Sequence, residues 1–136
     1  MIVGASIAAF ASVHGGPAVH AFLYAGRIID LNTLAGVAYD SAAYAVNDSL
    51  EIVGQSDIVA GGGAVEKHAF IYAKGVMYDA NSLLVNTVPA PLTNAVGIDC
   101  QGNVAAVADP VIEQNGGRTT HHFLLVRQGS ARDCHS

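Results

Sequence analysis

Histidine is the chemistry-bearing residue that recurs most regularly along this chain. It opens three similar segments, His-Ala-Phe-Leu-Tyr from His20, His-Ala-Phe-Ile-Tyr from His68 and His-His-Phe-Leu-Leu from His121. Because imidazole is a common metal ligand, three such units arranged around an axis would bring the rings onto one ion. A residue repeated in every unit more often serves the packing of that unit, so we expect each His to begin a strand and bond a neighbouring turn. We therefore predict no metal ligand.

Aspartate recurs with the histidines, at Asp30 and Asp79. Two carboxylates held about 5–9 Å apart can act as general acid and base, as in glycosidases. No other catalytic group shares their spacing, so we expect each Asp to end a strand and to accept hydrogen bonds from the backbone or from His. We predict no catalytic residue.

The remaining polar candidates carry weaker signals. Cys100 and Cys134 lack zinc-ligand spacing. The sequence is compatible with one disulfide between them and equally with two free thiols. Cys134 precedes His135, which suggests a thiol nucleophile, but a polar terminal segment offers no scaffold to orient the pair. The glycines at 61–63 lack the Lys-Ser/Thr of a phosphate loop and are typical of a flexible connector. We predict no cofactor.

Aromatic residues divide into two groups. One group alternates along the His-initiated segments and is expected in the core, namely Tyr24, Tyr72, Phe22, Phe70 and Phe123. For the other group, Tyr39, Tyr44 and Tyr78, exposure and stacking on a sugar ring are the less favoured alternative.

Composition narrows the class of protein. The chain has 136 residues, enough for one domain, and 51% of them are apolar while 12% are charged, which favours a packed structure. The net charge is −5, and the six basic residues are scattered, so we expect neither nucleic-acid binding nor a polybasic membrane patch. The apolar run 1–13 lacks a basic flank and is too short to span a bilayer, so we expect neither a signal peptide nor a membrane span.

A second landmark repeats in step with the histidines. Ile-Val-Gly-x-Ser begins at Ile2 and again at Ile52, with a weaker copy at Val104. Both landmarks recur about every fifty residues, which indicates an internal repeat. We divide a single domain, 1–128, into a partial unit 1–17, units 18–57 and 66–108, and a partial unit 119–128, followed by a flexible tail 129–136.

Each unit is predicted to hold four short strands and no helix. In the best-defined copies these lie at 68–72, 76–79, 42–46 and 51–55, joined by turns rich in Gly and Asn. Four antiparallel strands per fifty residues is the period of a β-propeller blade. The predicted fold is therefore all-β, with four-stranded blade-like repeats in an incomplete β-propeller-like array. Ten strands do not close a ring in the usual way. Three alternatives follow: assembly with copies of itself, membership of a longer array, or sheets that pack face to face. Exposed strand edges favour pairing with another chain.

These segments resemble the bacterial HAF repeat family, whose pattern is His-Ala-Phe-Leu-Tyr, a short turn, Asp-Leu-Gly-Thr-Leu, then Ile-Asn-x-x-Gly-x-Ile-Val-Gly. The matches are 20–24, 30–34, 43–54, 68–72 and 79–83. Asn32 and Asn81 stand where the family has Gly, and Leu50 stands at another Gly position. The resemblance implies an extracellular or envelope setting and brings no catalytic residues.

We therefore expect a non-enzymatic binding or interaction module outside the cell or in its envelope, with the loops 58–67 and 85–93 as its binding surface. A protein or glycan ligand fits this reading. One alternative is a self-assembling structural piece of a propeller. The least supported alternative is a glycan-active enzyme.

Overall fold

Strands account for nearly all the regular structure of this chain. The computed structural model describes residues 2–11, 16–86, 90–112 and 116–128, and in these ranges it contains ten strands, two short 3₁₀ turns and no α-helix. The elements are β1 (Ile2–Ala11), β2 (Pro17–Tyr24), β3 (Ile28–Asn32), β4 (Ser41–Val46), β5 (Ile52–Val59), η1 (Gly61–Gly63), β6 (Val65–Ala73), β7 (Val76–Asp79), η2 (Ala80–Leu83), β8 (Asn94–Ile98), β9 (Val104–Ile112) and β10 (Arg118–Leu125).

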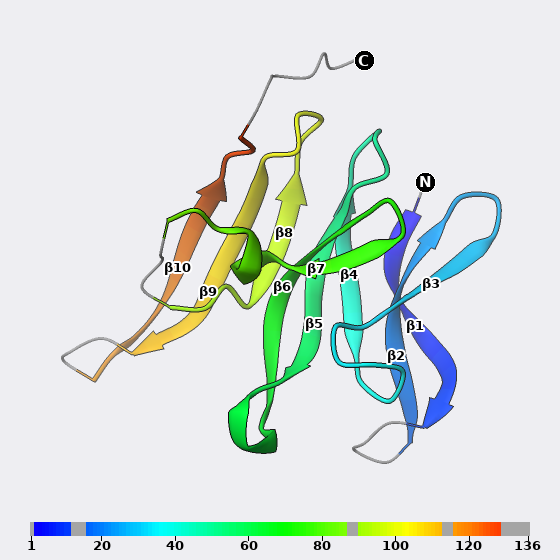
Figure 1. Ribbon diagram of the computed structural model, residues 1–136, viewed down its shortest axis with the longest axis horizontal. Helices are drawn as coiled ribbons and strands as arrows, with labels where there is room; N and C mark the ends of the chain where they lie inside the picture. The colour runs from blue at the N-terminus through cyan, green and yellow to red at the C-terminus, as the bar shows by residue number, and fades with distance from the viewer. Residues whose placement is uncertain (1, 12–15, 87–89, 113–115, 129–136) are drawn as a thin grey trace.

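The strands form three antiparallel sheets in chain order (Figure 1). The N-terminal sheet is β1-β2-β3, the middle sheet is β4-β5-β6-β7, and the C-terminal sheet is β8-β9-β10. Within each sheet, strands that are consecutive in sequence pair with each other, because short hairpin connections favour local antiparallel pairing. This confirms the predicted all-β fold, with antiparallel sheets of three or four strands in an incomplete array.

The two repeated landmarks pair with each other in every sheet. Gly4 lies opposite Phe22 in the N-terminal sheet, and Gly54 lies opposite Phe70 in the middle sheet. The third pair is Ala106 and Phe123. A Cβ on Gly54 or Gly4 would lie 2.9 Å from the facing Phe ring, so glycine leaves room for the ring to lie across the neighbouring strand.

The hairpin between β6 and β7 has the predicted tight turn. Ala73 pairs with Val76, which leaves Lys74 and Gly75 as a two-residue loop. Their φ angles are 52° and 83°, and two consecutive positive values define the type I′ turn that suits the twist of antiparallel strands.

A second turn recurs between β4 and β5 and between β8 and β9. In the first copy the Asn47 side-chain oxygen accepts the N–H groups of Ser49 and Glu51, and the Leu50 N–H donates to the Asn47 carbonyl. Leu50 has a φ of 59°, while its counterpart Gly102 has a φ of 86°. Leucine therefore occupies a left-handed position that its repeat fills with glycine.

Leu50→Gly is expected to stabilise the fold by about 0.5–1 kcal/mol, because the left-handed conformation costs a side-chain-bearing residue energy and Leu50 is half exposed. Ser49→Gly, in the same turn but without a positive φ, is the matched control and should destabilise the fold slightly. Urea unfolding of both variants checks this. A loss of stability in Leu50→Gly would show that the side chain contributes more than the backbone strain costs.

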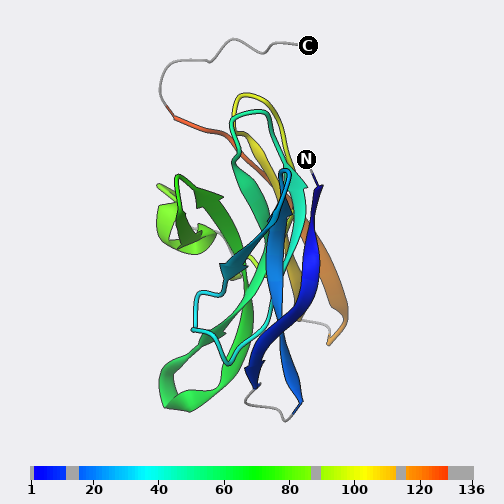
Figure 2. The same cartoon turned by 90° about the vertical axis from the view of Figure 1, so that its right-hand side faces the viewer.

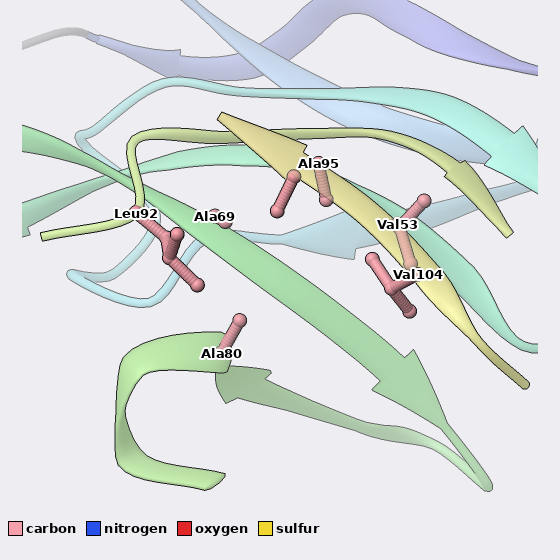
Figure 3. Packing of buried hydrophobic residues seen from close by; sticks show 7 residues of the cluster. Val53, Ala69, Ala80, Leu92, Ala95 and Val104 are labelled. Atoms are coloured by element: carbon pink, nitrogen blue, oxygen red, sulfur yellow. The ribbon is translucent and has the colours of Figure 1, made fainter. Parts of the chain in front are cut away.

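The middle sheet is covered on both faces. On β5, the neighbouring residues Ile52 and Val53 point to opposite sides, as the period of a strand requires. Ile52 and Phe70 pack against Ala21 and Leu23 of the N-terminal sheet. Val53 joins the cluster that contains residues of the C-terminal sheet, shown in Figure 3. That cluster consists of Val53, Ala69, Ala80, Leu92, Ala95, Val104 and Ala106.

The outer edge of the middle sheet departs from the plane of the others. Figure 2 shows the β7–η2 segment (green) standing off to one side of the three sheets. The Asp79 side chain accepts the backbone N–H of Asn81 and so caps η2, and Ala80 is buried at its start. This arrangement places η2 over the cluster between the middle and C-terminal sheets.

Two predictions about exposure and loops were wrong. Tyr24 was expected in the core, but it is 43% exposed because it lies on the outer face of the N-terminal sheet. Half of the predicted loop 58–67 is strand, since β5 and β6 stay paired as far as Val59 and Val65, and the loop is confined to 60–64. Antiparallel pairing continues through these residues until the glycines at 61–63 make the turn.

Candidate functional site

The repeated His and Asp residues form one short-range pair in each complete copy. In the N-terminal sheet, His20 Nδ1 lies 2.9 Å from Asp30 Oδ1. In the middle sheet, His68 Nδ1 lies 2.7 Å from Asp79 Oδ2. Each Asp also accepts a backbone N–H two residues further on, from Asn32 in the first copy. This is the arrangement expected for a strand-end Asp that accepts backbone and His hydrogen bonds.

The three histidines are not brought together. They lie on β2, β6 and β10, one in each sheet, so the sheet order separates them. Within the described ranges no group of three His, Cys, Asp or Glu side chains is placed to hold a metal ion. His121 instead lies with its ring 6.4 Å from that of Phe123. The alternative in which the three rings share one metal ion on an axis therefore finds no such arrangement among the described residues.

The two complete His–Asp pairs differ at the second ring nitrogen. His20 Nε2 lies 2.9 Å from the Val37 carbonyl oxygen, so both nitrogens of this buried ring face an acceptor. His68 Nε2 is buried and has no hydrogen-bond partner. Equivalent residues therefore have different environments in the two copies.

A polar pocket of about 460 Å³ lies beside His68, between the middle and C-terminal sheets. Its walls include Glu66 and Lys67 from β6 and Ala90, Pro91 and Thr93 from the segment before β8. The ends of the two loops predicted as a binding surface thus meet at this pocket. Residues 87–89 of the second loop lie outside the described residues.

A larger and more apolar groove of about 650 Å³ lies between the same two sheets, toward η2. Ile71, Leu84, Phe123 and Leu125 form much of its wall. At its rim Arg127 Nη1 lies 2.6 Å from Glu51 Oε2. This ion pair ties the end of β10 to the β4–β5 turn, and nothing in the sequence pattern indicated it.

Side-chain bonds to the backbone also hold the connection between η2 and β8. The Asn81 side-chain oxygen accepts the Leu92 N–H at 2.7 Å, and its Nδ2 donates to the Leu92 carbonyl at 3.0 Å. Ala69 then donates its N–H to that same carbonyl at 2.9 Å. Asn81, which stands at a Gly position of the resembled family, thus positions the segment that leads to the polar pocket.

A carboxylate in the repeated turn has a perturbed pKa. Asp99 Oδ1 accepts the N–H groups of Asn103 and Gln101, and the bond from Asn103 above all lowers the pKa of this carboxyl below its ordinary value. The charged form is therefore the one that holds the β8–β9 turn.

The three Tyr residues considered for sugar stacking do not form one platform. Tyr44 and Tyr78 are 49% and 42% exposed, but they lie on β4 and β7, the opposite edges of the middle sheet. Tyr39 lies in the connection before β4. One sugar ring cannot stack on residues placed this far apart across a four-stranded sheet.

The other candidates have structural roles or lie outside the described residues. Cys100 is disulfide-bonded, so it is not a free thiol. Cys134 and His135 lie outside the described residues. The glycines at 61–63 form η1, a single exposed turn between β5 and β6.

The two end sheets each leave one face without a neighbouring sheet among the described residues. The outer face of the N-terminal sheet carries Ile2 and Tyr24, which are 60% and 43% exposed. The outer face of the C-terminal sheet carries Leu124, which is 69% exposed. In the described part of the chain, β1 pairs only with β2, and β10 pairs only with β9.

Comparisons with known proteins found no similar protein. No family model, no curated protein and no solved structure matches the chain. Among the described residues, no helix is long and apolar enough to cross a membrane.

Proposed function

We propose that this protein is a non-catalytic β-repeat interaction module that stacks head to tail with further copies of itself, outside the cell or in its envelope. The observation that carries the proposal is the difference between the middle sheet, which is covered on both faces, and the two end sheets. The internal repeat supplies the template for the missing contacts.

The outer face of the N-terminal sheet matches a face that is already covered elsewhere. Ile2, Phe22 and Tyr24 correspond by repeat to Ile52, Phe70 and Tyr72 of the middle sheet. In the middle sheet those three residues pack against the sheet before it. The same residue types in the N-terminal sheet therefore suit a preceding sheet.

The outer face of the C-terminal sheet matches the opposite covered face. Ala105 and Leu124 correspond to Val53 and Ile71, which in the middle sheet pack toward the sheet after it. The two end faces are thus of opposite type and fit each other as neighbouring sheets do within the chain. A contact of this kind is heterologous and repeats to give rings or open chains.

The setting rests on two further observations. The His-Ala-Phe and Ile-Val-Gly segments resemble the bacterial HAF repeat family, which implies an extracellular or envelope location. The disulfide at Cys100 fits an oxidising compartment. Catalysis is not proposed, because the repeated Asp residues are each engaged by a His and a turn.

Light scattering or sedimentation across a wide concentration range tests the assembly. We expect the wild-type mass to rise beyond that of a dimer, and Leu124→Asp to weaken association at least about tenfold, because it places a charge in an apolar contact. Val59→Asp, at an exposed apolar residue away from both end faces, should associate like the wild type. A wild-type protein that stays monomeric at all concentrations would contradict the proposal.

A further inference from the structure

The polar pocket beside His68 has the character of a ligand site rather than a packing defect. Two buried polar atoms in the described residues have no hydrogen-bond partner, His68 Nε2 and Asn94 Oδ1, and both residues line this pocket. Buried polar atoms without partners are costly, so two of them at one pocket call for an explanation.

The protonation of His68 follows from its partner. The Asp79 carboxylate, whose Oδ2 lies 2.7 Å from His68 Nδ1, accepts and does not donate when ionised, so Nδ1 carries the hydrogen. In the neutral ring Nε2 then presents a lone pair to the pocket. Metal-binding His residues usually donate their other ring N–H to a carboxylate in this way, which fixes the orientation of the ring.

A carboxylate lies at a suitable separation from this lone pair. Glu66 Oε2 is 3.6 Å from His68 Nε2, too far for a hydrogen bond. Two ligands of one tetrahedral zinc ion, each about 2.0–2.1 Å from it, lie about 3.4 Å apart. Glu66 is half exposed, so a small rotation of its side chain brings the two atoms to that spacing.

The same location in the first copy of the repeat lacks these groups. Glu66 corresponds to Ala18, and Asn94 corresponds to Ala42. Gln55, also in the pocket wall, corresponds to Ala5. Around His20, where alanines stand at these positions, the Val37 carbonyl satisfies Nε2. Oxygen-bearing side chains therefore accompany the free nitrogen and are missing where the nitrogen is engaged.

We infer that this pocket binds a divalent transition-metal ion, Zn²⁺ in the first instance, through His68 Nε2, the Glu66 carboxylate and Asn94 Oδ1. Among the described residues of the wall, Lys67 is the cationic side chain, and it is held by Asp57. Only two of the ligands are His or carboxylate, so water completes the coordination and binding is of modest affinity. Because Glu66 and His68 are on β6 and Asn94 is on β8, the ion fastens the middle sheet to the C-terminal sheet.

Calorimetric titration of EDTA-treated, dialysed protein with zinc chloride tests the site. We expect one equivalent to bind, and binding to weaken at least about tenfold in His68→Gln and in Glu66→Gln. Glu66→Gln changes a half-exposed side chain, so it keeps the test valid if His68→Gln fails to fold. His122→Gln, at an exposed histidine outside the pocket, should bind zinc like the wild type.

A second readout separates this site from other histidines. Zinc should raise the melting temperature of the wild type and of His122→Gln, and should raise that of Glu66→Gln clearly less, because zinc bound in the pocket stabilises the folded state in proportion to its affinity. Absence of zinc binding, or binding that persists undiminished in both His68→Gln and Glu66→Gln, would overturn the inference.

Discussion

Gly54→Ala is expected to destabilise the protein by at least about 3 kcal/mol, a large share of the stability of a domain this size. The added Cβ would lie 2.0 Å from the Ala42 carbonyl oxygen and 2.9 Å from the Ala43 Cα. Both are backbone atoms of the paired strand β4, so this clash can be relieved only by moving the edge strand β4 away from β5, and the Phe70 ring, also 2.9 Å from the added Cβ, would have to shift as well.

Gly97→Ala is the matched control, because Gly97 also lies within a strand of the repeat. Its added Cβ would meet nothing closer than the Ala105 Cβ at 3.8 Å, an ordinary contact. We expect its unfolding free energy to stay within about 1 kcal/mol of the wild type. Equal losses in the two variants, measured by urea unfolding, would mean that β4 and β5 do not approach as closely as described.

Phe70→Ala is expected to cost about 3–5 kcal/mol, since Phe70 is fully buried between the middle and N-terminal sheets. Phe22→Ala, at the corresponding position of the N-terminal sheet, should cost clearly less because the face on which Phe22 lies has no sheet against it in the described residues. The unfolding free energies of both variants should be measured at low protein concentration, so that association between copies does not contribute to them. Similar losses for both variants would show that the two sheets are equally enclosed.

The sequence predicted the strands well because the repeat supplies two independent copies of each signal. The predicted strand 76–79 has the bounds that the structure shows for β7 (Val76–Asp79). The alternation of apolar residues and the positions of glycines are local patterns along the chain, so they can be read directly from the sequence.

The division into sheets did not follow from the repeat. A repeat unit that starts at a His-Ala-Phe strand, such as β2 to β5, contains strands of two sheets. The sheet boundaries fall after β3 and after β7, whereas β5 pairs with β6 of the next unit. Tyr24 was misplaced for the same reason. Its alternation shows which face it shares with Phe22, but only the number of sheets stacked outside decides whether that face is buried.

The position of the polar pocket could not be predicted from the sequence, for a different reason. Glu66, His68 and Asn94 come from two sheets, and their proximity depends on how Asn81 fixes the segment at Leu92. The sequence did offer one usable signal, the replacement of small residues by polar ones at matched positions of the two copies. That comparison becomes informative once the register of the strands is known.

Mixing two singly blocked variants tests the central claim, that the end faces fit each other head to tail. Tyr24→Asp blocks the N-terminal face and Leu124→Asp blocks the C-terminal face, both at exposed residues. We predict that each variant alone is monomeric by light scattering, and that an equimolar mixture forms a one-to-one dimer and nothing larger, because one free face of each type remains. A mixture that stays monomeric, or either variant that dimerises with itself, would contradict the account.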